Sequence, residues 1–342
     1  MFAAVGKLLT GCGGGDGTTD GSRTLSGYHT IDPHAHPDQF QRGSANKTDL
    51  SSTTDALSST RFAASAYAAI GDGAGDRYAA AVGQLAYPLG LAGEGKLKIV
   101  RSVADIPDET ATGYKPGAIL AIEGGDALAG NLDNVKNLRD LGVRILTLVH
   151  YRNNQIGDIM KPDSGTDPGP YSGGLTAFGG QVIGKMEELG MLVDVAHAST
   201  DTLADICNVV TKPFVDSHTS PSRTETPTSP TRLRTWAEME MMAAKGGVIC
   251  LWPAAYDHPT KPRRTFANWA AEIVAMKSAL GIEHVALGTD GCGSLPSMID
   301  GYSSVADLPK LADAMRNAGL TESDLKAFFG GNLLRVLRDA IG

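Results

Sequence analysis

The stretch that decides the fold is Met191-Leu192-Val193-Asp194-Val195-Ala196-His197, an apolar run that follows Gly190 and ends on an imidazole. A run of four to six apolar residues bounded by Gly or Pro is typical of a strand buried on both faces of a parallel sheet. Four further segments share this layout, at 28–36, 118–123, 213–218 and 284–290. Each of them also ends on an acidic or imidazole side chain, namely His36, Glu123, His218 or Asp290.

This repetition predicts an α/β fold of the (β/α)8 TIM-barrel type. We expect strands near 28–33, 61–69, 118–122, 143–149, 190–196, 212–217, 246–252 and 284–289. Apolar residues three and four apart predict helices at 132–141, 180–189 and 237–244, and a C-terminal amphipathic helix at 323–338 that is broken at Gly330-Gly331. Residues 41–60 and 71–117 are expected to form a loop-rich excursion with helices, and 255–268 and 291–305 to be loops.

Side chains at the carboxyl ends of barrel strands meet on one rim. A single His after a strand is more often structural than a ligand, but four of the eight His in this chain fall at strand ends. These are His34, His36, His197 and His218, and Glu123 and Asp290 occupy equivalent places. Imidazoles and carboxylates in these numbers predict a centre for two divalent metal ions, and therefore a binuclear metallohydrolase.

Length and charge agree with this interpretation. A chain of 342 residues accommodates one barrel of about 250 residues with insertions. The net charge of −8 and the lack of a basic cluster argue against nucleic-acid binding. The four Cys show no CxxC pairing, and no stretch approaches the 18 apolar residues of a membrane span.

The first 27 residues differ in composition from residues 28–342, which we expect to form the barrel. Leu9-Thr10-Gly11-Cys12 resembles a bacterial lipobox, and a Gly-rich stretch typical of a flexible linker follows it. Lys7 interrupts the preceding apolar segment, which is short for a signal peptide. Two interpretations therefore stay open: a lipoprotein on the periplasmic side of the cell envelope, attached to the membrane only through a lipid on Cys12, or a cytoplasmic protein.

Several short segments occur in order along the chain: AIEGG at 121–125, GVRILTLVH at 142–150, RNN at 152–154, GGLT at 173–176, LGMLVD at 189–194, HAS at 197–199, SH at 217–218, GGVI at 246–249 and GGNLLRV at 330–336. Through these segments the chain resembles the membrane (renal-type) dipeptidases, which are zinc enzymes of the amidohydrolase barrel superfamily. The resemblance runs from about residue 28 to the C-terminus.

The resemblance implies a role for each candidate site residue. Glu123 bridges two metal ions, most simply zinc; His34, His36 and Asp290 complete one site, and His197 and His218 the other. His150 matches the histidine that stabilises the transition state. Arg232 matches the arginine that binds the substrate carboxylate, with Arg223 and Arg234 as competitors. The implied substrate is a small dipeptide, and a homodimer stays open.

Two positions depart from the family pattern. The first motif is usually His-x-Asp, whereas this chain has His34-Ala35-His36, a form common in the wider superfamily. Asp38 competes with His36 for the ligand role, although His36 has the parity of a strand-end pair. After Asp290 the family often has a further Asp, where this chain has Cys292, which is either a bystander or a soft ligand.

The expected chemistry follows from these groups. Two divalent ions share a water and lower its pKa, so that a bridging hydroxide attacks a scissile carbonyl. Asp290 accepts the proton of the water, His150 steadies the tetrahedral oxyanion, and an Arg fork binds a terminal carboxylate. A dipeptidase is the main hypothesis. The alternatives are another amidohydrolase, such as a deacetylase or lactonase, and a non-catalytic envelope protein on the same barrel.

Overall fold

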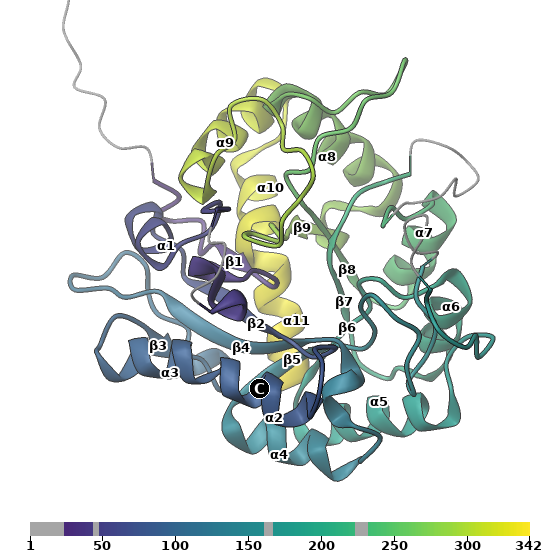
Figure 1. Ribbon diagram of the computed structural model, residues 1–342. Helices are drawn as coiled ribbons and strands as arrows, with labels where there is room; N and C mark the ends of the chain where they lie inside the picture. The colour runs from purple at the N-terminus through teal and green to yellow at the C-terminus, as the bar shows by residue number, and fades with distance from the viewer. Residues whose placement is uncertain (1–23, 44–47, 161–166, 223–231) are drawn as a thin grey trace, which may run out of the picture.

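A ring of parallel strands surrounded by helices makes up the computed structural model, which describes residues 24–43, 48–160, 167–222 and 232–342 (Figure 1). The strands are β1 (Ile31–Asp32), β2 (Ala64–Ile70), β3 (Lys98–Ile99), β4 (Gly117–Glu123), β5 (Val143–Thr147), β6 (Leu192–Asp194), β7 (Val215–Thr219), β8 (Val248–Leu251) and β9 (Val285–Leu287). The predicted (β/α)8 barrel and its eight strands are confirmed. Cys12, Arg223 and most of the expected linker lie outside the described residues.

The strands pair in the order β1-β2-β4-β5-β6-β7-β8-β9, and every pairing is parallel. The two ends of this sheet meet just beyond β1 and β9, where Ala35 forms a parallel bridge with Gly291. The Asp290 amide donates to the His34 carbonyl at 3.0 Å, and the His36 amide donates to the Gly291 carbonyl at 2.7 Å. These contacts close the ring. They place the segment with His34 and His36 beside the segment with Asp290.

The two-residue strand β3 is an addition to the prediction. It pairs with the start of β4 outside the ring, inside the excursion that we expected to hold only loops and helices. Lys98-Ile99 is too short a stretch to show any periodicity in the sequence.

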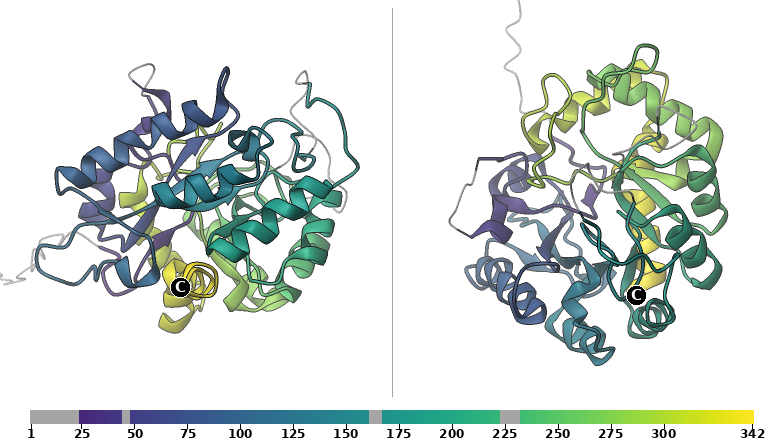
Figure 2. Two further views of the ribbon diagram at one scale, coloured as in Figure 1. Left: turned by 90° about the horizontal axis from the view of Figure 1, so that it is seen from below. Right: turned by 45° about the vertical axis from the view of Figure 1, so that its right-hand side comes forward.

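Helices lie around the ring in both views of Figure 2. They are α1 (Thr54–Thr60), α2 (Arg77–Gln84), α3 (Ala86–Gly93), α4 (Asp133–Leu141), α5 (Ala177–Leu189), α6 (Thr200–Val209), α7 (Trp236–Ala244), α8 (Phe266–Leu280), α9 (Leu308–Asn317), α10 (Glu322–Lys326) and α11 (Asn332–Ile341). Several begin at a residue whose hydroxyl accepts from the first turn, as Thr176 does for α5 and Ser199 for α6. Among the described residues, the structure contains no helix with the length and apolar character needed to cross a bilayer.

Alternation along the strands separates an inner core from an outer one. In β4, Ile119 and Ala121 pack inside the ring, whereas Leu120 and Ile122 pack in the cluster that includes the surrounding helices. Glu123 continues the inner row, because successive side chains of a strand point to opposite faces. A buried carboxylate is thus placed at the carboxyl end of the ring interior.

The C-terminal helix continues through Gly330-Gly331, so the predicted break there was wrong. Ala327–Gly331 forms one π-helical turn that joins α10 to α11. A Cβ atom on Gly330 would lie 1.8 Å from the carbonyl oxygen of His29, so the glycine serves a close approach to the chain before β1. A π turn inserts one extra residue without ending a helix.

Candidate metal centre

Side chains from several strand ends converge on the carboxylate of Glu123. Its Oε1 atom lies 3.2 Å from the Nε2 atoms of His34 and His197, 3.4 Å from that of His150 and 3.7 Å from that of His218. Its Oε2 atom lies 3.3 Å from the Nε2 atom of His36.

The carboxylate of Asp290 completes this cluster. Its Oδ1 atom lies 3.8 Å from the Nε2 atom of His36 and 4.0 Å from that of His34. The structure therefore brings together all six residues predicted as ligands, and His150 with them. Three overlapping groups have the spacing of metal ligands: His34, Glu123 and His218; His34, His36 and Asp290; and Glu123, His150 and His197.

The backbone at two of these positions is left-handed, although neither residue is Gly. His197 has a φ of 67° and Asp290 a φ of 48°. Such conformations cost free energy and persist where surrounding contacts hold them, often at functional sites. Each residue lies three positions after the end of its strand, β6 or β9, and its side chain reaches the centre from there.

Hydrogen bonds from the Nδ1 atoms fix two of the imidazoles. The Nδ1 atom of His36 lies 2.6 Å from the carbonyl oxygen of Ala68, to which it donates. The Nδ1 atom of His218 lies 2.8 Å from the Oγ atom of Ser217, which in turn donates to Asp194 at 2.7 Å. In both rings this arrangement leaves the Nε2 lone pair directed at the centre, as a metal ligand requires.

Three buried carboxylates stabilise the segments that carry the ligands. Asp194 accepts from the amides of Ala196 and Ser217, each at 3.0 Å. Asp32 accepts from the amides of His34 at 3.2 Å and Thr289 at 3.1 Å, and burial raises its pKa to about 6.

The third of these carboxylates, Asp216, holds the Nε atom of Arg234 at 2.6 Å. Arg234 in turn donates to the carbonyls of Val195 and Ala198, on either side of His197. Arg234 has no exposed surface and is not among the residues that line the cavity beside the centre, so it does not compete for the role predicted for Arg232.

The protonation preferences suit metal binding. Burial lowers the pKa of His197 to about 3, and burial together with the charge of His34 lowers that of His218 well below its usual value. Both rings are therefore neutral near pH 7, with a lone pair to offer. Burial opposes ionisation of Glu123, but the surrounding imidazoles, His150 first, outweigh it and hold its pKa well below the usual range.

His34 behaves differently. Burial disfavours its charged form, but Glu123, Asp290 and Asp194 outweigh this and raise its pKa to about 9. Within the described part of the chain, neither ring nitrogen of this fully buried imidazole has a hydrogen-bond partner. The surrounding carboxylates favour the protonated, positively charged form of His34. Binding of a metal ion to this ring would release the proton.

A cavity of about 330 Å³ opens beside the centre. It is lined by Glu123, His150, Asp290 and Arg232, among other residues. The Arg232 guanidinium donates from Nη2 to the Tyr151 hydroxyl at 3.2 Å and lies over the rings of Tyr151 and Trp252, with centroid distances of 5.3 and 5.7 Å. A guanidinium that stacks on aromatic rings suits a carboxylate ligand.

The two residues left open by the sequence are engaged elsewhere. Asp38 accepts from the Thr54 hydroxyl at 2.6 Å and from the Tyr87 hydroxyl at 3.1 Å. The Sγ atom of Cys292 donates toward the carbonyl oxygens of Ser52 and Asp49, at 2.9 and 3.1 Å. Neither side chain belongs to the groups with ligand spacing.

Sequence reasoning missed Asp72, Tyr151 and Trp252, which lie against the centre. Asp72 lines the cavity two residues after β2, so the same strand-end pattern would have identified it. Tyr151 follows His150 directly, but nothing in the sequence places its ring beside Arg232.

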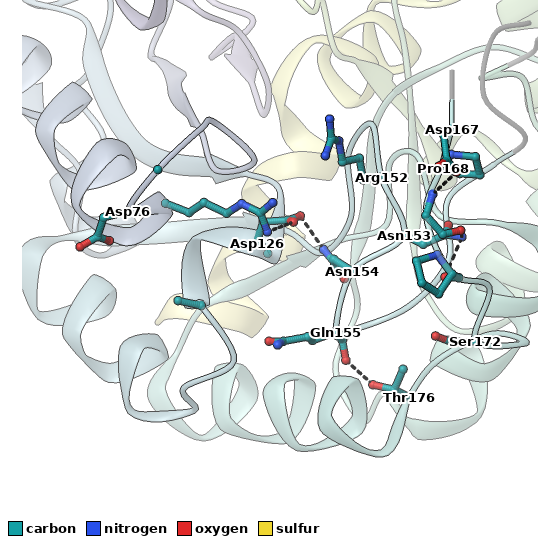
Figure 3. A pocket seen from close by; sticks show the side chains of 16 residues that line it. Asp76, Asp126, Arg152, Asn153, Asn154, Gln155, Asp167, Pro168, Ser172 and Thr176 are labelled. Carbon is teal, nitrogen blue, oxygen red and sulfur yellow. Dashed lines mark hydrogen bonds and ion pairs between the residues drawn. The ribbon is translucent and has the colours of Figure 1, made fainter. Parts of the chain in front are cut away.

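A larger hollow of about 1070 Å³ lies near the cavity (Figure 3). Both are lined by residues of the loop that follows β2 and of the loop that follows β5. Asp126 lies at its centre and accepts from Arg77 at 3.0 Å and from Asn154 at 2.9 Å. Gln155 and Thr176 line it as well, but none of the predicted site residues does. These contacts hold the 151–155 loop on the side away from the ligands.

Relatives with solved structures share this fold. A metallopeptidase from Rhodobacter sphaeroides, solved with a phosphinate mimic of the dipeptide L-Ala-D-Ala, is 20% identical with a TM-score of 0.76, over 91% of this chain and 99% of that one. A dipeptidase of peptidase family M19 is 21% identical with a TM-score of 0.78, over 92% and 98%.

Two proteins that are similar in sequence also carry the name dipeptidase. Dipeptidase verJ of Clonostachys rogersoniana is 28% identical over 71% of this chain and 60% of that protein, and dipeptidase aclJ of Aspergillus oryzae is 29% identical over 70% and 55%. The matches thus span less than two thirds of these relatives. The model of the membrane dipeptidase family (peptidase family M19) matches residues 63–341. This chain therefore belongs to the membrane dipeptidase family, peptidase family M19.

Proposed function

We propose that this protein hydrolyses the peptide bond of dipeptides that carry a free C-terminal carboxylate, using two zinc ions held around Glu123. The observation that carries the proposal is the convergence of four imidazoles and two carboxylates on one buried point, beside a cavity that Arg232 also lines. Family membership supports peptide hydrolysis, and the dipeptide mimic bound to the Rhodobacter sphaeroides relative supports the substrate class.

The number of ligands supports two ions rather than one. A catalytic zinc ion usually takes three protein ligands and keeps one position open, whereas six candidate side chains are present here. His34, His36 and Asp290 would hold one ion, and His197 and His218 the other. Glu123 has one oxygen facing His36 and the other facing both His34 and His197, so each of its oxygens is available to a candidate ligand set.

The residues fit the ions in two further respects. The Nε2 atoms of His197 and His218 lie only 2.9 Å apart, and the buried ring of His34 lacks hydrogen-bond partners in the described residues. Unpaired ring nitrogens in a buried site are costly unless a ligand engages them. Imidazole nitrogen and carboxylate oxygen are donors that zinc accepts.

When bound, the two ions would supply an activated water and polarise the scissile carbonyl. Asp290 faces the same point and would take the proton of the attacking water and pass it to the leaving amine. His150 presents its Nε2 atom at the cavity wall and would donate to the carbonyl oxygen as charge develops there.

Arg232 would set the length of the substrate. Its guanidinium lies at the cavity wall, held against Tyr151 and Trp252, where it suits the paired oxygens of a carboxylate. The cavity of about 330 Å³ is near the lower limit for small-molecule pockets, which favours a substrate the size of a dipeptide.

A substrate panel on purified, zinc-loaded protein tests this function. We expect hydrolysis of free dipeptides, much slower hydrolysis of their C-terminal amides, and loss of activity after chelation that zinc restores. N-acetyl amino sugars and lactones represent the other amidohydrolase chemistries. Turnover of these compounds with no turnover of any dipeptide would refute the proposal.

A further inference from the structure

Asp72 contacts the imidazole of His150 from the side opposite the metal centre. Its Oδ1 atom lies 3.2 Å from the Nδ1 atom of His150, while the Nε2 atom of that ring lies 3.4 Å from Glu123. The Oδ2 atom of Asp72 accepts from the Tyr151 amide at 3.4 Å. We propose that Asp72 is a positioning residue, which holds the His150 ring so that its Nε2 edge faces the scissile carbonyl.

The backbone is built to bring these two residues together. Gly71 donates its amide to the Glu123 carbonyl at 2.7 Å, and a Cβ atom at Gly71 would lie 2.0 Å from the Gly124 carbonyl oxygen. Only glycine permits this approach of the chain after β2 to the chain after β4. The approach carries Asp72, the next residue, to the wall where His150 lies.

Asp72 is the one polar partner that the described residues offer to the Nδ1 atom of His150. The ring has 4% of its side-chain surface exposed, and the contact with Asp72 is an ion pair rather than an aligned hydrogen bond. Contacts of catalytic groups are often loose without substrate and tighten when it binds. On the Nε2 side the ring faces Glu123, and the aromatic rings of Tyr151 and His197 pack against it without fixing which nitrogen faces the cavity.

The 151–155 loop is held from its other side as well. Asn154 donates to Asp126 and to the Leu148 carbonyl, at 2.9 and 3.0 Å, so this loop keeps two anchors that do not involve Asp72, although the bond from the Tyr151 amide is lost with the carboxylate. Removing the Asp72 carboxylate should therefore change the ring and leave the loop in place. This separates a positioning role from a general loss of structure.

The inference rests on the proposed function, because it assigns a step of that reaction to the His150 ring. The matched variants are Asp72→Ala, Asp72→Asn and Asp76→Asn. Asp76 carries the same charge on the same loop and caps α2, and Asn caps a helix as well as Asp does.

We expect Asp72→Ala to lower kcat roughly 10- to 100-fold, with KM changing less than about threefold. The kcat of Asp72→Asn should lie between those of Asp72→Ala and the wild type, since the amide oxygen can still face Nδ1. The kcat of Asp76→Asn should equal that of the wild type.

A double-mutant cycle with His150→Ala decides whether Asp72 acts through His150. If it does, adding Asp72→Ala to His150→Ala causes no further loss of kcat. If Asp72 instead binds the amino group of the substrate, Asp72→Ala raises KM, and the loss persists in the His150→Ala background. Either of these results would overturn the inference, as would an unchanged kcat in Asp72→Ala.

Crystal structures of the wild type and Asp72→Ala give a readout that does not depend on turnover. We expect the His150 ring to rotate or shift in the variant, while the 151–155 backbone and the zinc content stay unchanged. A ring that keeps its position without Asp72 overturns the inference even if the protein proves to have another substrate. A wild type that is inactive on every dipeptide, with a ring that moves in Asp72→Ala, refutes the proposed function and retains the positioning role.

Discussion

The Nε2 atom of His36 lies 3.3 Å from the Oε2 atom of Glu123, at the position where the family resemblance implies an aspartate. The Nδ1 atom of the same ring donates to the Ala68 carbonyl, and this bond directs Nε2 to the centre. As a metal ligand, His36 would make the site one charge more positive than an aspartate would. The ring geometry favours His36 over Asp38 as the ligand.

Replacing each of the two residues separates these candidates. His36→Ala should lower the zinc content measured by elemental analysis, because a ligand is lost. Asp38→Ala should keep the zinc and lower the melting temperature instead, because Asp38 holds Thr54 and Tyr87. The reverse pattern of zinc loss would show that Asp38 supplies the ligand.

Asp290→Asn tests the proton transfer. An amide oxygen can still face a metal ion, but the amide cannot accept the proton of the attacking water. We expect the variant to retain much of its zinc and to lose about 10²- to 10⁴-fold in kcat on a free dipeptide. Stopped-flow or discontinuous assays with zinc analysis of the same sample measure both quantities. Wild-type turnover in this variant would assign the proton to another group.

Arg232→Ala tests recognition of the terminal carboxylate. Hydrogen bonds to charged groups contribute about 1.5–3 kcal/mol, so kcat/KM for free dipeptides should fall roughly 10- to 100-fold. The same variant should act on a C-terminal amide as the wild type does. Arg232→Lys is the matched control, since it keeps the charge but not the planar fork. Equal losses on the free and amidated substrates would place the arginine in a structural role.

The pH dependence of Cys292 labelling tests whether this thiol is a ligand. Burial raises its pKa to about 11, despite the opposing hydrogen bond from the Ser52 amide. The folded protein thus favours the neutral thiol, and the reactive thiolate forms only as the pH approaches that value. At pH 8, iodoacetamide should label Cys292 roughly 100-fold more slowly than in the unfolded chain. Mass spectrometry of the peptide measures the rate, which should be the same with and without zinc. Protection that appears only with zinc would make Cys292 a ligand.

The barrel and the convergence of the candidate ligands could be predicted because both depend on local patterns. Apolar runs such as 191–196 identify buried strands, and parallel strands place the residues that follow them, His197 among them, on one rim. Contacts between distant segments gave no such signal. Gly330 in the last helix permits the close approach of the His29 carbonyl, and no pattern within 323–338 reveals that neighbour.

The surroundings of the centre were less predictable for the same reason. Asp72 reaches His150 because Gly71 packs on Gly124, a contact between two strands that are 53 positions apart in the sequence. The role of Arg234 likewise became clear only from its buried pairing with Asp216. The sequence favoured Arg232 for the substrate carboxylate and left Arg223 and Arg234 as competitors.

Zinc stoichiometry coupled to activity tests the central claim most directly. Metal-free protein is titrated with zinc while bound zinc and hydrolysis of a free dipeptide are measured on the same samples, for the wild type and for Glu123→Gln. We predict two zinc ions per wild-type chain with activity that tracks their binding, and a Glu123→Gln variant that loses zinc and activity together. Retention of two ions with near-normal turnover in Glu123→Gln, or full wild-type activity in the metal-free protein, would contradict the account.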